Sequence, residues 1–229
     1  MKKRVTPDCA SCQTLPPDRA CMRPAGRTWE GCPTAAKGRV LKEARVAYQE
    51  PTTREFARQA SIQEGACYAG REQKSYVMHP VKPRILEICE FASRMGYKRL
   101  GLVFCMGLFR EASVVREILG GQGFEIVSAG CKAGCVPKEE IGVKDSEKIY
   151  IGEHETMCNP VFQAMLVNEA KTDFNVLLGL CVGHDSLFFK HAEAPTTVLA
   201  VKDRVTGHNP LAAVYASGNY YAWLKGPKE

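Results

Sequence analysis

Residues 99–131, RLGLVFCMGLFREASVVREILGGQGFEIVSAGC, decide the fold of this chain. The run 99–105 is short and apolar almost throughout, which is typical of a strand buried on both faces. Residues 110–123 have helical spacing, with Val115, Ile118 and Leu119 facing inward, and 124–131 is a second buried strand. Strand, helix and strand in this order predict parallel strands joined by a crossover helix.

The same alternation continues on both sides of this stretch. Helices are predicted at 84–96, 159–172, 184–191 and 209–218, and further strands at 174–181 and 196–202. Asn159 and Asn209 each precede a proline, and each is predicted to cap its helix. The fold class is therefore α/β. We expect a Rossmann-like three-layer α/β/α domain with a mostly parallel sheet, over residues 81–229.

The N-terminal part has a different composition. Residues 1–37 are rich in cysteine and proline and have little hydrophobic periodicity. The segment therefore cannot fold on apolar burial alone and needs a stabilising group such as a bound metal. Residues 38–80 are predicted to be helical and to pack on the α/β core. A first helix stops at Pro51, and Thr52 or Thr53 is the expected cap of the next. Cys67 and Cys89 lie on apolar helix faces, which predicts that both are core residues.

Composition limits the class of protein. The chain has 229 residues, a net charge of +6 and no basic block longer than KKR, which argues against nucleic-acid binding. The basic N-terminus lacks the apolar region of a signal peptide, and no run is long enough for a membrane span. A cytoplasmic protein is expected. The odd count of eleven cysteines then indicates metal, iron–sulfur or thiol redox chemistry instead of disulfides.

Five cysteines follow the predicted strands or precede a helix. They are Cys105, Cys131, Cys135, Cys158 and Cys181. Because ligands of parallel sheets bind outside the carboxyl ends of the strands, these thiols are predicted to converge on one bound centre. Converging thiolates suit zinc or an iron–sulfur cluster. The alternative is that each is a small buried residue at a strand end.

A second group of cysteines lies in the N-terminal segment. Its members are Cys9, Cys12, Cys21 and Cys32, with the spacing C-x2-C-x8-C-x10-C-P. A C-x2-C pair with two further cysteines nearby predicts a metal site. Both a structural zinc knuckle and a [4Fe–4S] cluster remain open, with the cluster slightly favoured because a proline follows the last cysteine.

Other polar residues are predicted at the same rim of the sheet. They are His184, Asp185, Lys202, Asp203, Arg204 and His208. We expect His184 to act as an acid, a base or a hydrogen-bond donor. The lysine and arginine would hold a small anionic substrate. The alternatives are a helix cap at Asp185 and a solvated loop at 202–208. Standard nucleotide-binding and serine-hydrolase motifs are absent from the sequence.

The stretches KAGCVPKEEIG, CNPVFQAMLVNEAK and GLCVGHDSLFFKH resemble the bacterial and archaeal family called domain of unknown function 1847. Its members are usually labelled only as metal-binding proteins, so the resemblance implies cysteine-bound metal and no particular activity. It implies the N-terminal ligands at Cys9, Cys12, Cys21 and Cys32. It also matches GLCVGHD and CNP at the strand ends, whereas Cys135 is a weaker match.

Three functions follow from these expectations. The first is an iron–sulfur protein, in redox or sulfur-handling catalysis or with an electron-transfer partner. The second is a non-catalytic zinc protein that stores, senses or is stabilised by the metal. The third is a metal-free thiol-redox protein using Cys131 and Cys135. The sequence leaves open whether the protein is an enzyme and what its oligomeric state is.

Overall fold

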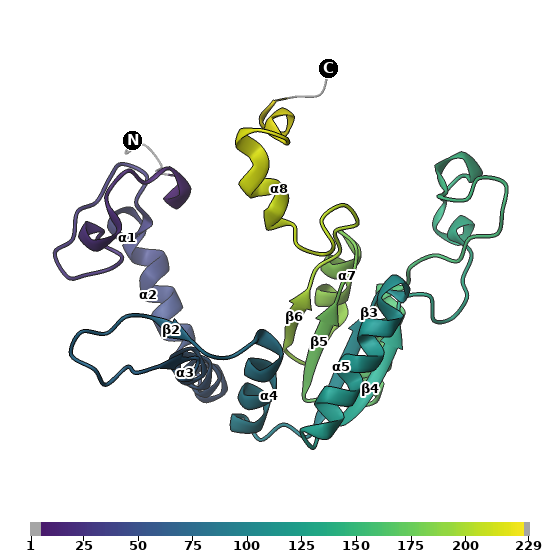
Figure 1. Cartoon of the computed structure of the whole chain (residues 1–229), viewed down its shortest axis with the longest axis horizontal. Helices are drawn as coiled ribbons and strands as arrows, with labels where there is room; N and C mark the ends of the chain where they lie inside the picture. Colours follow the sequence, from purple (N-terminus) through teal and green to yellow (C-terminus); the bar gives the residue numbers. More distant parts are fainter. Residues whose placement is uncertain (1–5, 227–229) are drawn as a thin grey trace. The chain divides into compact units, whose positions relative to one another are not determined.

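A computed structural model describes residues 6–226 of the chain. The chain divides into two compact units between Gly65 and Ala66. Figure 1 shows their elements along the chain, and each unit is described by itself. The domain boundaries expected at residues 37 and 80 stay a prediction.

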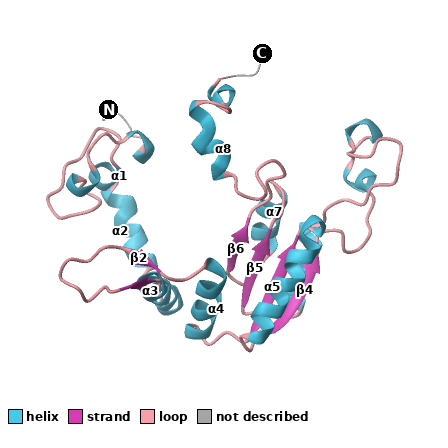
Figure 2. Ribbon diagram, viewed as in Figure 1, coloured by secondary structure: helices cyan, strands magenta, loops and turns pink. Residues whose placement is uncertain are grey.

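A four-stranded parallel sheet is the centre of the second unit, which confirms the α/β class. Its strand order is β4-β3-β5-β6 (Figure 2). The strands are β3 (Arg99–Phe104), β4 (Glu125–Gly130), β5 (Phe174–Leu178) and β6 (Thr196–Ala200). The order reverses between β3 and β5, because the chain leaves β3 toward β4 and leaves β5 toward β6. In open parallel sheets this reversal marks the crevice where ligands bind.

Four helices precede or follow these strands along the chain. They are α4 (Arg84–Arg94), α5 (Phe109–Gly121), α6 (Pro160–Glu169) and α7 (His184–His191). Helix α5 contacts β3 and β4, while α6 contacts β4 and α7. Helix α4 is tied to β6 by the Arg84 guanidinium, which donates to the carbonyl of Val198 at 2.7 Å. The alternation of strand and helix is as predicted, and the three-layer arrangement stays a prediction.

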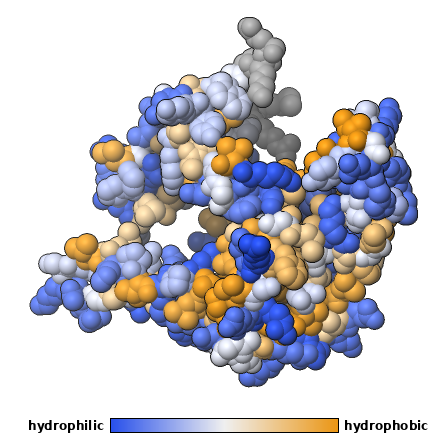
Figure 3. All heavy atoms as spheres, turned by 45° about the vertical axis from the view of Figure 1, so that its right-hand side comes forward, coloured by the Kyte–Doolittle hydropathy of each residue, from blue (hydrophilic) through white to orange (hydrophobic). Residues whose placement is uncertain are grey.

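Apolar burial explains why these segments form the sheet. Every residue of β5 is buried, as are all residues of β3 except Arg99. Such strands read as continuous apolar runs, because helices cover both faces of a parallel sheet. Cys67 and Cys89 are both buried, as predicted. Apolar side chains also reach the surface of the protein, as the orange areas of Figure 3 show.

Short elements complete the second unit. A hairpin pairs β1 (Tyr68–Ala69) with β2 (His79–Pro80). Single-turn 3-10 helices are η3 (Met106–Leu108), η4 (Lys138–Ile141), η5 (Asp145–Glu147), η6 (Ala216–Gly218) and η7 (Ala222–Lys225). The helix expected over 209–218 is shorter, because α8 covers only Leu211–Tyr215 and its N-cap is Pro210 instead of Asn209. Asn159 does cap α6, since its Oδ1 accepts from the Phe162 amide at 3.0 Å.

The first unit is made of short turns and two longer helices. Its elements are η1 (Cys9–Ser11), η2 (Pro16–Asp18), α1 (Pro33–Ala36), α2 (Gly38–Ala47) and α3 (Pro51–Ala66). The predicted cap of the last helix is wrong. The carboxylate of Glu50 accepts from the amides of Thr52 and Thr53 at 2.9 and 2.6 Å, so Glu50 caps α3. In the part of the chain described, no helix is long and apolar enough to cross a membrane.

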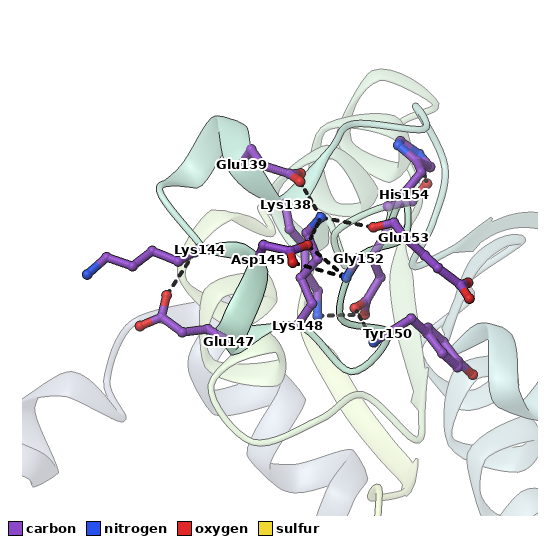
Figure 4. Close-up of polar contacts among 12 residues, drawn as sticks. Lys138, Glu139, Lys144, Asp145, Glu147, Lys148, Tyr150, Gly152, Glu153 and His154 are labelled. Carbon is purple, nitrogen blue, oxygen red and sulfur yellow. Dashed lines mark hydrogen bonds and ion pairs between the residues drawn. The ribbon is translucent and has the colours of Figure 1, made fainter.

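Residues 136–157 form a lobe that leaves the sheet after β4 and returns to it before α6. A bridge pairs Pro137 with Thr156 at its base. Inside the lobe, Lys148 binds the carboxylates of Glu139 and Asp145 and donates to the carbonyl of Glu153 at 2.9 Å (Figure 4). These ion pairs and turns order a segment that has little regular secondary structure.

Candidate functional site

Three cysteine side chains meet at the carboxyl end of the sheet. Cys105 follows β3 and Cys131 follows β4, and the Cys131 amide donates to the Phe104 carbonyl at 2.9 Å. Cys158 precedes α6 and is brought in by the Asn159 amide, which donates to the Cys131 carbonyl at 2.7 Å. Cys105 and Cys131 belong to one buried cluster against which Cys158 packs, and the thiol of Cys131 interacts with the other two. We call these three residues the thiol cluster.

Glycine makes this close approach possible. A Cβ added to Gly130 would stand 2.6 Å from the sulfur of Met106 and 3.3 Å from the ring of Phe104. The first distance is shorter than real Cβ contacts, and the second is tighter than most of them. The backbone amide of Met106 donates to the Cys131 sulfur at 3.3 Å. The bare glycine backbone therefore lets the turn after β3 reach the sulfur at the end of β4.

The thiol cluster favours two thiolates around one thiol. The hydrogen bond from Cys131 lowers the pKa of Cys105 to about 5, and Gly107 and Lys202 act in the same direction. The pKa of Cys158 is lowered to about 4 by Cys131 and then by His184. The pKa of the Cys131 thiol is raised, because its neighbours Cys105 and Cys158 favour its protonated form and because it is buried. At neutral pH the cluster thus holds negative charge on its outer sulfurs.

His184 is the first residue of α7 and contacts Cys158. This contact raises the pKa of the imidazole, since the neighbouring sulfur favours its protonated form. Its Nδ1 is buried and has no hydrogen-bond partner among residues 6–226. Asp185 turns to its own backbone, where its Oδ1 accepts from the amides of Gly183 and Ser186 at 3.0 and 2.7 Å. His184 therefore lies beside the thiol cluster, whereas Asp185 stabilises the turn before α7.

Cys181 lies on the same rim but has a different partner. It follows β5 by three residues, is half-buried, and its sulfur accepts from Nη2 of Arg204 at 3.1 Å. Lys202 follows β6, yet its ammonium reaches the end of β3. A Cβ added to Gly107 would stand 3.0 Å from Lys202 Nζ and 3.8 Å from the Cys105 sulfur. Lys202 thus extends from the end of β6 to the neighbourhood of the thiol cluster.

Two other predicted residues order their own loop. The Asp203 Oδ1 accepts from the amides of Val205 and Thr206 at 3.0 and 2.9 Å. These bonds, with that to Thr206 first, lower the pKa of Asp203. Nδ1 of His208 accepts from the Asp203 amide at 3.2 Å. Both residues therefore shape the segment that carries Lys202 and Arg204.

Cys135 is separate from the thiol cluster. It is exposed, and its sulfur lies 3.6 Å from Thr156 Oγ1, at the base of the lobe. Its φ of +51° places it in the left-handed region, directly after Gly134, whose φ is +90°. The structure thus brings three of the five predicted cysteines together, and their convergence on a bound centre stays a prediction. Cys181 shares their rim, and Cys135 lies at the start of the lobe.

Sequence reasoning missed two residues of this site. Gln163 is fully buried on α6, and its Nε2 donates to the carbonyls of Phe104 at 3.2 Å and Ala129 at 2.7 Å. It therefore ties together the strand ends that carry two of the thiols. A polar residue within an apolar helix was the available signal. Lys132 donates to the carbonyl of Thr156, and its charge helps to lower the pKa of Cys158.

The N-terminal cysteines occupy turns of the first unit. These residues are Cys9, Cys12, Cys21 and Cys32. The Asp8 amide donates to the Gly31 carbonyl at 3.1 Å, which brings the first and last of the four into neighbouring stretches. The pKa of Cys32 is lowered, mainly by the backbone amide of Ala35. Across residues 6–226, no group of three or more Cys, His, Asp or Glu side chains is arranged to hold a metal ion.

The fold and the site define a cysteine-rich α/β protein with a thiol cluster at the carboxyl edge of a parallel sheet. The chain belongs to the family described as protein of unknown function DUF1847, whose sequence model matches residues 32–199. The match begins at Cys32, so the other three N-terminal cysteines lie outside it.

A relative from Methanocaldococcus jannaschii, described as uncharacterized protein MJ0455, is similar to much of this chain. It is 46% identical over 140 residues, which cover 61% of this chain and 69% of the relative. No solved structure matches the chain.

Proposed function

We propose that this is a metal-binding protein in which the thiol cluster, with His184 as a fourth donor, holds a soft metal ion. The observation that carries the proposal is the contact of three sulfurs from three separate segments of the chain. One buried cysteine at a strand end is an ordinary core residue. Three in mutual contact, two of them with lowered pKa values, form a donor set for a thiophilic metal.

The chemistry of the fourth donor fits the same proposal. The His184 Nδ1 is a buried nitrogen without a hydrogen-bond partner among the described residues, so it can serve as a donor to a metal ion. As they lie among the described residues, these side chains are not arranged to hold a metal ion, so holding one requires rotations of the side chains. Metal binding would also release the proton that Cys131 retains.

Single-ion binding suits three thiols packed closely together better than a cluster does. Zinc–sulfur bonds of about 2.3 Å at tetrahedral angles require neighbouring sulfurs about 3.8 Å apart. The ligands of a [4Fe–4S] cluster must spread around a body of eight atoms. We therefore favour zinc at the thiol cluster. Iron–sulfur chemistry there, and metal at the four N-terminal cysteines, stay predictions.

A second candidate is thiol chemistry without a metal, and the pair of Cys158 and His184 favours it. A cysteine with a lowered pKa beside a histidine is a common arrangement for an activated nucleophile. Redox or sulfur-handling catalysis would use the same pair. For both candidates we propose a reducing, cytoplasmic setting, since thiolates of this kind are oxidised outside it. We also propose the Rossmann-like three-layer arrangement for the sheet and its helices.

Metal content per chain tests the proposal. Full-length protein purified without oxygen is analysed for zinc, iron and acid-labile sulfide, beside the variants Cys131→Ser and Cys135→Ser. Loss of one metal ion per chain in Cys131→Ser alone supports the proposal, because Cys135 lies outside the thiol cluster. Equal metal in all three proteins contradicts it and leaves metal-free thiol chemistry at this edge.

A further inference from the structure

We infer that Cys181, Lys202 and Arg204 form a binding site for a small oxyanion, such as a carboxylate or a sulfur oxyanion, beside the thiol cluster. The inference goes beyond the proposed function, because it requires no metal. Cys181 follows β5, one of the two strands between which the order reverses, and Lys202 and Arg204 follow its neighbour β6. Ligands of open parallel sheets bind in the crevice at this point.

Two positive charges at this crevice lack a compensating carboxylate. In the part of the chain that the structure describes, neither Lys202 nor Arg204 takes part in an ion pair. The nearest acids along the chain are engaged elsewhere. Asp203 accepts from the amides of Val205 and Thr206. Asp185 accepts from backbone amides of its own turn. The cations are therefore available to an anionic ligand.

Arg204 and Lys202 supply the kinds of donor that an oxyanion requires. Arg204 uses Nη2 for the Cys181 sulfur, and its planar fork retains further N–H groups for bidentate contact with a carboxylate or similar group. Lys202 supplies a point charge that also reaches Cys105. Cys181 is half-buried, and its sulfur contacts the Arg204 guanidinium. An oxyanion held here would present its other end to a thiol.

Alkylation kinetics test this site. Iodoacetate carries a carboxylate, whereas iodoacetamide is neutral and reacts by the same displacement: the sulfur of Cys181 bonds to carbon and iodide leaves. At each cysteine we compare the rate of alkylation by iodoacetate with the rate by iodoacetamide. We expect this ratio to be about tenfold higher at Cys181 than at exposed Cys135 of the same molecule. Rates at both residues are measured by peptide mass spectrometry on the full-length protein.

Variants identify the cause. Lys202→Met and Arg204→Met are each expected to remove most of the preference at Cys181. Lys190→Met, in the last turn of α7, should retain it. Circular dichroism confirms that each variant is folded. An equal preference at Cys181 and Cys135 would overturn the inference. Equal slowing of iodoacetate and iodoacetamide at Cys181 in Arg204→Met would also overturn the inference. The guanidinium would then act on the Cys181 thiol alone and not on the carboxylate of the reagent.

The metal content of the same samples separates this inference from the proposed function. Protein without metal that still prefers iodoacetate at Cys181 retains the anion site and contradicts the metal proposal. Protein with one metal ion per chain and no preference for iodoacetate at Cys181 supports the metal proposal and contradicts the anion site.

Discussion

Replacing Gln163 with methionine should destabilise the sheet edge that carries the thiol cluster. The amide of Gln163 donates to the Phe104 and Ala129 carbonyls at 3.2 and 2.7 Å and is fully buried. Two such bonds contribute about 2 kcal/mol in net terms. The Oε1 of Gln163 is buried without a hydrogen-bond partner among residues 6–226. Burying an unpaired oxygen costs about 1 kcal/mol, and methionine removes this cost. The net loss is about 1 kcal/mol, because methionine otherwise has a similar shape.

Urea unfolding measures this difference, with Gln122→Met as the control. Gln122 is exposed at the end of α5, where a substitution should change the free energy of unfolding by less than about 0.5 kcal/mol. Metal affinity gives a second readout, since Gln163 holds the strand ends that precede Cys105 and Cys131. A Gln163→Met variant with the stability and the metal affinity of the parent would refute this role of the side chain.

Three further predictions concern the charged groups. In metal-free protein, thiolate absorbance should persist as the pH falls to about 5 and diminish in Cys158→Ser, whereas absorbance lost near the ordinary thiol pKa of 9.0 would contradict the lowered pKa values. Glu50→Gln should speed hydrogen exchange at the amides of Thr52 and Thr53. The pKa of Glu50 is lowered to about 2, mainly by the amide of Thr53, so this difference should be full above pH 4.5 and fade as the pH falls toward 2. Glu155→Gln should make the lobe more sensitive to proteolysis, because Glu155 accepts from Lys138 at 2.6 Å and from the Ile149 amide at 2.8 Å. Exposed Glu140→Gln is its control, and equal cleavage of both variants would contradict the prediction.

The apolar runs made the sheet predictable from the sequence. The strands over 99–104 and 174–178 are buried almost throughout, and few other structures suit runs of this length between helices. The contact of Cys105, Cys131 and Cys158 was predictable for the same reason, since parallel strands end at one edge of the sheet.

Other features depend on contacts that no local pattern encodes. Gln163 binds carbonyls that are 59 and 34 residues away in the chain, so its role follows from the sheet and not from its own helix. Glu50 caps α3 in place of the predicted threonines, because its longer side chain reaches two amides of the first turn. Cys135 lies outside the thiol cluster, contrary to the prediction. The chain turns through left-handed conformations at residues 134 and 135 and begins the lobe there.

X-ray absorption by the bound metal tests the central claim most directly. The sample is the full-length chain with Cys9→Ser and Cys12→Ser, which removes ligands of the predicted N-terminal site. The account predicts three sulfur neighbours at about 2.3 Å and one nitrogen at about 2.0 Å, with one sulfur lost in Cys131→Ser. A bound metal with only oxygen and nitrogen neighbours, or a sulfur shell unchanged in Cys131→Ser, would contradict a metal centre at the thiol cluster.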